Sequence, residues 1–199
     1  MKASKSGAGQ GHAKGLLFNY LRDWAIDTHS QEAWERALDK TTPREKQLYE
    51  SFVLASSWQP VDAWNTVVRA FFEQEYADPN EGMSVFCAHL GELELTTLVR
   101  LVLQIGSPEF MLKRTGFLWN RYFDTGTFGA EEQDRGHWRL WLDADTDVAS
   151  AAGVLTCANG PGPWLQRGLA LSGVGGTVQH VRCRFRGHPR CEFEAKFRR

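Results

Sequence analysis

The sequence predicts an α+β fold, in which an N-terminal helical layer packs on one face of a C-terminal antiparallel sheet. Apolar residues recur at helical spacing through most of residues 15–126. Alternation of apolar and polar residues is instead concentrated in residues 137–143, 176–186 and 190–198. Helices that come first and strands that come late are typical of α+β folds and not of alternating βαβ units.

Several of the expected helices begin at recognisable capping residues. A helix is expected from Gly15, a second after Ser30, and a third at Thr42-Pro43-Arg44-Glu45, which offers a hydroxyl cap, Pro at the first helical position and an acid in the first turn. The remaining helical segments are expected from Gln59 past Phe72, from Met83 to about Ile105, from Ser107 to near Gly126, and from Asp145 to Leu171 with a break at residues 159–163.

The last two expected strands form a hairpin, with Gly187-His188-Pro189 as the turn. Opposed charges on the outer face would help to set the register of this hairpin. The inner face of the first strand is expected to carry Val181, Cys183 and Phe185, and that of the second Cys191, Phe193, Ala195 and Phe197. The outer face is expected to carry Arg182, Arg184, Arg186, Glu192, Glu194 and Lys196.

Length and composition suit one folded domain. We expect a disordered tail over residues 1–14, which are rich in Lys, Ser and Gly, and a single domain over residues 15–199. The net charge of −1 gives no general attraction to nucleic acid or to anionic lipid. No signal peptide or membrane-spanning apolar run is visible, so we expect a cytoplasmic protein whose four cysteines are reduced.

Three of the cysteines lie in the last third of the chain, at Cys157, Cys183 and Cys191, and His180 and His188 lie near them in sequence. Cysteine and histidine are preferred zinc ligands, but buried cysteines also pack as small apolar side chains without any metal. His180 and Cys183 are three residues apart, so in a regular strand they would point to opposite faces. Both can bind one ion only if a β-bulge separates them.

The segment Cys183-Arg-Phe-Arg-Gly187-His-Pro-Arg-Cys191-Glu-Phe193 resembles the C-terminal signature of 4-vinyl reductase domains. The segment Phe117-Leu-Trp-Asn-Arg-Tyr-Phe-Asp-Thr-Gly126 is similar to an aromatic segment of related bacterial proteins, so the resemblance covers about residues 110–198. The superfamily includes haem-nitric-oxide-associated domains, sensory domains of phenol-responsive activators and transport protein particle subunits. Gly15-Leu-Leu-Phe18 and Pro60-Val-Asp-Ala-Trp64 are also similar to uncharacterised myxobacterial proteins.

The resemblance implies a structural zinc site. Phenol-type sensory domains hold zinc with three cysteines and a glutamate that lies three residues before the second cysteine. The matching positions here are Cys157, His180, Cys183 and Cys191, so that His180 stands where the family has glutamate. Imidazole also binds zinc, and the same four positions therefore remain the expected ligands.

Aromatic residues supply a candidate ligand pocket between the helices and the sheet. Trp119, Tyr122 and Trp138 are the candidate pocket residues, with His89 and His137 as further polar groups, although aromatic residues at such spacing also form ordinary cores. The sequence has no Gly-rich phosphate loop, no His-Glu-x-x-His and no Gly-x-Ser-x-Gly. We therefore do not expect an enzyme.

Two functions remain open from the sequence. One is a signalling sensory domain that binds a small hydrophobic or aromatic ligand and contains a structural zinc ion. The alternative is a protein-interaction scaffold that acts without ligand, as a homodimer or in a larger complex.

Overall fold

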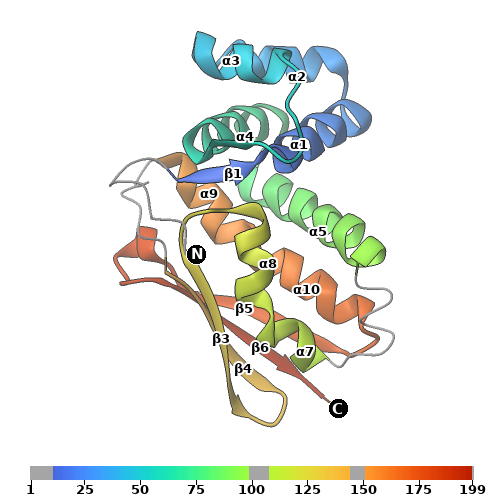
Figure 1. Cartoon of the computed structure of the whole chain (residues 1–199), viewed down its shortest axis with the longest axis vertical. Helices are drawn as coiled ribbons and strands as arrows, with labels where there is room; N and C mark the ends of the chain where they lie inside the picture. The colour runs from blue at the N-terminus through green and yellow to red at the C-terminus, as the bar shows by residue number, and fades with distance from the viewer. Residues whose placement is uncertain (1–10, 99–107, 144–150, 199) are drawn as a thin grey trace, which may run out of the picture.

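The computed structural model describes residues 11–98, 108–143 and 151–198. Its sheet is four-stranded and antiparallel, with the strand order β3-β4-β6-β5. The strands are β3 (Thr127–Asp134), β4 (His137–Asp143), β5 (Gly176–Arg182) and β6 (Cys191–Phe197). The predicted α+β architecture is confirmed, because the helices gather on one side of this C-terminal sheet (Figure 1).

The helices of the N-terminal half begin close to the predicted capping residues. Ser30 Oγ accepts a hydrogen bond from the Ala33 backbone N–H at 3.1 Å, and Thr42 and Glu45 form a capping box. The helices are α1 (Gly15–Thr28), α2 (Gln31–Leu38), α3 (Pro43–Glu50), α4 (Val61–Glu75) and α5 (Pro79–Leu98).

Helix α5 begins four residues before the predicted start at Met83, because Pro79 occupies the first helical position and Asp78 caps the turn. The Asn80 N–H donates to Asp78 Oδ1 at 2.9 Å. The predicted end of this helix, near Ile105, lies outside the described residues.

The remaining helices are shorter than expected. The single helix predicted after Ser107 is two, α7 (Pro108–Lys113) and α8 (Thr115–Tyr122), which meet at Arg114. The predicted break at residues 159–163 is confirmed, since α9 (Ala151–Asn159) ends where α10 (Pro161–Leu171) begins. Among the described residues, no helix is both long enough and apolar enough to cross a membrane.

Strand pairing adds three strands that the sequence pattern did not indicate. Strand β1 (His12–Lys14) pairs with β2 (Trp58–Pro60), so regular structure begins within the tail expected over residues 1–14. Strand β3 was missed because its second half, Glu131-Glu-Gln-Asp134, is polar and exposed. It forms because β4 offers it a free edge.

The buried side chains form two cores, which we call the helical core and the sheet core. Trp164 of α10 packs against both of them. Figure 1 shows helices α1–α4 at one end of the molecule and the sheet at the other, and α9 and α10 connect the two, since α9 contacts α4 and α10 contacts β5. The helical core includes Phe18, Trp24, Trp34, Trp64, Phe71, Phe72 and Phe86, and the sheet core includes Trp138, Leu140, Leu142, Leu165, Leu169 and Phe193.

The backbone of helix α8 lies in close contact with the backbone of strand β3. A Cβ atom at Gly116 would lie only 2.6 Å from the carbonyl oxygen of Phe128, so the close approach requires glycine. This contact holds Trp119 and Tyr122, on the same helix, over the interior of the molecule.

The outer edge of β5 is paired by a side chain instead of a further strand. Gln166 of α10 donates from Nε2 to the Gly176 carbonyl oxygen at 2.9 Å, and its Oε1 accepts from the Val178 N–H at 2.7 Å. One amide thus satisfies two backbone groups of an edge that would otherwise be open to pairing with another chain.

Replacement of this amide tests its contribution to stability. Gln166→Leu leaves the Gly176 carbonyl and the Val178 N–H without their partner, so we expect the free energy of unfolding to fall by about 1–3 kcal/mol. Urea denaturation measures the change. Gln179→Leu, at an exposed position of the same strand, is the matched control, and an equal loss in both variants would contradict the assignment.

Candidate functional site

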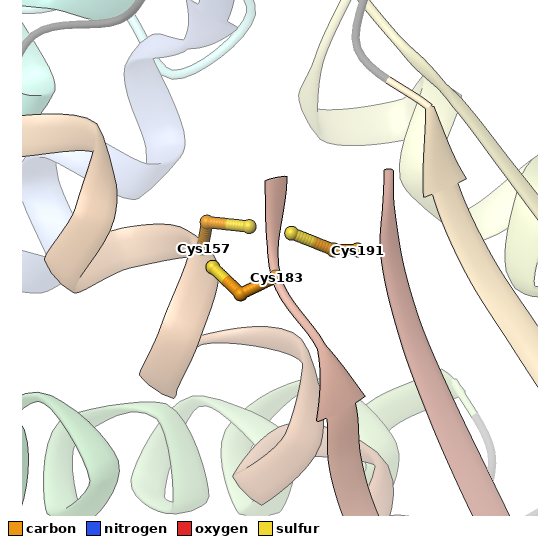
Figure 2. A group of neighbouring side chains, drawn as sticks. All are labelled: Cys157, Cys183 and Cys191. Carbon is orange, nitrogen blue, oxygen red and sulfur yellow. The ribbon is translucent and has the colours of Figure 1, made fainter. Parts of the chain in front are cut away.

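Three buried cysteines converge where the β5–β6 hairpin meets helix α9 (Figure 2). Cys157 comes from α9, Cys183 follows β5 and Cys191 opens β6. Their sulfur atoms all lie within 4.8 Å of one another, and the residues are 8%, 4% and 0% exposed. A group of thiols at this spacing is able to hold a soft metal ion such as zinc.

The chain between the two hairpin cysteines makes a tight turn instead of continuing the strand. Residues Arg184–Arg186 form a short 3-10 helix, and Gly187 has the left-handed backbone conformation, with φ of 87°. Cys183 therefore lies at the end of the strand. Phe185, which was predicted to share its strand face, lies in the turn instead. The turn directs the backbone N–H groups of Phe185 and Arg186 to the Cys183 sulfur, where they favour the thiolate.

Strand β5 contains a β-bulge between His180 and Cys183, which these two residues need in order to face the same ion. His180 pairs with Phe193 and Arg182 with Glu192, so Val181 is the extra residue between two consecutive partners. Val181 is 44% exposed, and the prediction that it shares the buried face of Cys183 is wrong for this reason. The bulge turns His180 and Cys183 towards the same side of the sheet.

His180 lies next to the cysteine group. Its ring stacks on Phe193 with the centroids 4.5 Å apart, and its Nε2 is buried without a hydrogen-bond partner among the described residues. Among the residues that the structure describes, the possible metal-ligand atoms that all lie within 4.8 Å of one another here are the three sulfurs, and no nitrogen of His180 is among them. His188, the other nearby imidazole, is exposed in the turn.

The pKa values of the three thiols are shifted in different directions. The pKa of Cys191 is lowered, because the Cys157 thiol donates a hydrogen bond to it and His180 lies beside it. The pKa of Cys157 is raised by the same hydrogen bond and by burial, and that of Cys183 is raised by burial and by the charge of Cys191. The hydrogen bond between Cys157 and Cys191 therefore favours the thiolate at Cys191 over one at Cys157.

A cavity of about 190 Å³ lies between the helical core and the sheet core. Two of the three candidate pocket residues, Trp119 and Tyr122, line it, and the third, Trp138, is not among the lining residues. Trp138 is buried in the sheet core, where Lys113 of α7 lies over its ring. Neither His89 nor His137 is among the described lining residues. The wall is mainly apolar and includes Leu17, Trp64, Met83, Leu90, Leu118, Phe123, Phe128, Leu142, Trp164 and Leu165.

Glu94 is the carboxylate of the cavity wall, and it was not singled out as a pocket residue from the sequence. It is 9% exposed and accepts hydrogen bonds from two tyrosine hydroxyls, that of Tyr20 at 2.7 Å and that of Tyr122. Burial and the hydrogen bond to Glu94 raise the pKa of Tyr20 to about 12, and the same two causes raise that of Tyr122 further. An acid within an otherwise apolar helical stretch was the available sequence signal.

The cysteine group and the cavity share a wall. Cys157 belongs to both, and Arg184 and Phe185 of the hairpin turn also line the cavity. At the preceding residue, the Thr156 hydroxyl donates to Asn65 Oδ1 of α4 at 2.8 Å. Residues 156 and 157 therefore connect the hairpin, the cavity and the helical core.

Comparison with known proteins gives no match in sequence: no family model matches the chain, and no curated protein does. Solved structures do match. The chain is similar to an H-NOX protein from Shewanella oneidensis in the Fe(II)NO ligation state, with a TM-score of 0.70 and 13% identity over 94% of this chain and 99% of that chain. It is also similar to the unliganded Fe(II) H-NOX protein from K. algicida, with a TM-score of 0.70 and 9% identity over 94% and 97% of the two chains.

These matches extend over almost the whole of both chains, while the sequences share very little. The agreement therefore concerns the course of the backbone, from the N-terminal helices to the last strand. The chain has the fold of an H-NOX domain.

Proposed function

We propose that this chain is a non-catalytic sensory domain, which binds a small hydrophobic molecule in the cavity and a structural zinc ion at Cys157, Cys183 and Cys191. The single observation that carries the proposal is the shared wall: Cys157 belongs to the thiol group and also lines the mainly apolar cavity. The H-NOX fold supports a sensory role, and the resemblance of the hairpin to 4-vinyl reductase domains supports the zinc.

The side chains that line this cavity do not supply a suitable axial ligand for haem iron. The similar structures are described in iron-ligation states, and one addresses haem distortion in the H-NOX family. Haem iron is held by histidine, by a cysteine thiolate, by methionine with histidine, or by tyrosine. None of the six histidines of the chain lines the cavity. Burial raises the pKa of Cys87 to about 12, so its thiol stays protonated, and Tyr122 is engaged by Glu94.

Haem does not fit by size or charge either. An apolar cavity of roughly 150 Å³ holds one benzene molecule, so the 190 Å³ found here suits one substituted ring and not four pyrroles. Arg184 is the one basic side chain among the described lining residues, whereas the two haem propionates carry two negative charges. We therefore propose a smaller, haem-free occupant for this chain.

The donor set favours zinc at the thiol group. Three cysteines and one histidine form a closed tetrahedral site of the structural kind. Backbone N–H groups that point at Cys183 and Cys191 add to the stability of the thiolates. We propose His180 as the fourth ligand, since its Nε2 is buried without a partner among the described residues and the bulge turns it to the inner side of the sheet.

A sensor needs a partner, and one part of the surface is suited to one. Phe52 is 88% exposed and Leu54 is 56% exposed in the segment before β2. We propose that this apolar segment contacts a second copy of the chain or a protein partner.

Metal content tests the zinc site directly. We expect about one zinc per chain in protein purified without chelator, because the three thiols form a single site. Cys191→Ser should lose the metal, as measured by elemental analysis. Cys87→Ser is the matched control, since Cys87 is equally buried but lies outside the group, and it should keep the metal.

The same measurement tests the fourth ligand. His180→Phe keeps a ring to stack on Phe193 but removes the imidazole nitrogen, and we expect the zinc affinity to fall roughly tenfold or more. A folded wild-type protein without metal, or a His180→Phe variant with unchanged affinity, would contradict the respective assignment.

Proton release on zinc binding follows from the pKa values of the three thiols. At neutral pH the lowered pKa of Cys191 leaves it ionised, while Cys157 and Cys183 hold their protons. Zinc displaces both remaining protons, so the affinity should rise roughly hundredfold per pH unit near neutrality and fall as the pH is lowered. Calorimetry in buffers of different ionisation enthalpy counts the protons. Release of three would show that Cys191 is protonated before the metal binds.

Binding of a one-ring probe tests the cavity. Fluorobenzene, followed by ¹⁹F NMR, should bind the wild-type protein. Leu118→Trp fills the cavity from helix α8 and should weaken binding by roughly tenfold or more. Phe117→Trp, at the adjacent and 70% exposed position, should leave binding unchanged. Binding that is unaffected by Leu118→Trp would exclude this cavity as the site.

A further inference from the structure

The outer face of the sheet points away from the helices. In the part of the chain that the structure describes, the helices gather on the inner face, and the outer face lies towards solvent (Figure 1). Much of this outer face is a lattice of opposite charges: Arg139 of β4 is paired with Glu131 of β3 at 3.0 Å, and Lys196 of β6 with Glu194 at 2.7 Å. Such pairs neutralise one another and leave little for a partner to recognise.

The end of the outer face next to the hairpin turn differs from this lattice. Trp141 of β4, Glu192 of β6 and Arg182 of β5 lie side by side in the strand register. The Arg190 guanidinium lies over the Trp141 ring, 5.0 Å from its centroid. Val181, the extra residue of the bulge, is 44% exposed and lines a recess of about 380 Å³ together with Arg182 and Glu192. We call these residues the outer-face patch.

Positive charge exceeds negative charge in the outer-face patch. Arg190 Nε donates to Glu192 Oε1 at 2.9 Å, whereas Arg182 Nη1 lies 3.6 Å from Glu192 Oε2, which is longer than a hydrogen bond. One carboxylate thus faces two guanidinium groups, each of which has several N–H donors. The Arg182 side chain is 60% exposed, so its donors are open to an acceptor from outside the chain.

The outer-face patch also contains residue types that carry binding energy at protein interfaces, since tryptophan and arginine are enriched among such residues. The Trp141 ring is partly exposed and is held on both of its sides. It lies against Gly129, where a Cβ atom would be only 2.3 Å from the ring, and under the Arg190 guanidinium. A ring fixed in this way loses little conformational freedom when a partner covers it.

We propose that the outer-face patch binds an acidic, partly apolar segment of a partner protein. Carboxylates of this segment pair with Arg182 and Arg190, and an apolar side chain lies on Trp141. The inference goes beyond the proposed function, since it requires neither a ligand in the cavity nor a metal ion. A nucleic acid or an anionic membrane fits less well, because Glu192 lies at the centre of the patch and the net charge of the chain is −1.

Titration with an acidic peptide tests the outer-face patch. The probe is the fluorescein-labelled peptide Asp-Glu-Leu-Asp-Glu-Phe-Asp-Glu, and its matched control carries Asn and Gln at the acidic positions. We expect the full chain to bind the acidic peptide at low salt and the neutral peptide much less, as measured by fluorescence anisotropy. The affinity should fall as salt is added, because exposed charges are screened.

Two variants and one spectrum place the binding. Arg182→Ala should weaken the acidic peptide roughly three- to tenfold, since it removes one ion pair at a partly exposed site. Arg69→Ala removes the same charge from α4 and should leave the affinity unchanged. In the ¹⁵N–¹H spectrum, the assigned indole N–H of Trp141 should move with the peptide, while that of Trp119, which lines the cavity, should not.

Each contrary outcome overturns the inference. These outcomes are no binding of the acidic peptide, equal binding of the neutral peptide, or equal affinities of Arg182→Ala and Arg69→Ala. Tighter binding of a single-stranded DNA oligonucleotide or of phosphatidylserine vesicles, with the same loss in Arg182→Ala, would assign the outer-face patch to nucleic acid or lipid instead. None of these results bears on the cavity or on the thiol group, which fluorobenzene and zinc test separately.

Discussion

The apolar inner face of the four-stranded sheet has to be covered, and most of the architecture depends on how this is done. Leu140 of β4 and Phe193 of β6 are directly paired and fully buried, and helix α10 supplies the cover through Leu165 and Leu169. Burial of side chains of this size contributes about 1.5–3 kcal/mol each. Helix α10 also contacts α5, so the helix that covers the sheet also attaches the helical half of the molecule to it.

The thiol group is a consequence of the same packing. Helix α9 precedes α10 with one residue between them, so the docking of α10 on the sheet carries Cys157 to the end of the β5–β6 hairpin. The hairpin turn holds Cys183 and Cys191 at the same end, with its backbone N–H groups directed at their sulfurs. A metal ion at this position would connect α9 to the hairpin and would thereby strengthen the junction of the two cores.

The cavity lies where two cores meet without merging. Aromatic residues of the helical core pack on one another, as Phe18 and Phe86 do on Trp64, and those of the sheet core pack on the strands, so that neither set fills the space between them. The hydrogen bonds of Glu94 with Tyr20 and Tyr122 join α5 to α1 and α8 across this space. Since Cys157 borders the cavity, occupancy of the cavity and of the metal site would act on the same short segment of α9.

Local chemistry made much of the fold predictable. Ser30, the capping box at Thr42 and Glu45, and Pro161 mark helix ends by interactions within a few residues, and the structure has helices there. Strand β4 was identified correctly because Trp138, Leu140 and Leu142 alternate onto one buried face. Strand β3 escaped prediction because half of it is polar, and an edge strand depends on its neighbour more than on its own residues.

The sequence by itself determined the helix caps, the alternating strands and, through the spacing of Cys183 and Cys191, a hairpin with two inward thiols. Only the tertiary structure decided that Cys157 joins them, that a bulge at Val181 turns His180 to the same side, and that Trp138 lies in a core while Trp64 and Glu94 line a cavity. The reason is physical: caps and alternation depend on neighbours a few residues away. A cavity wall or a metal site instead collects side chains from separate elements, such as Cys157 of α9 and Cys191 of β6, whose meeting is set by the packing of whole elements.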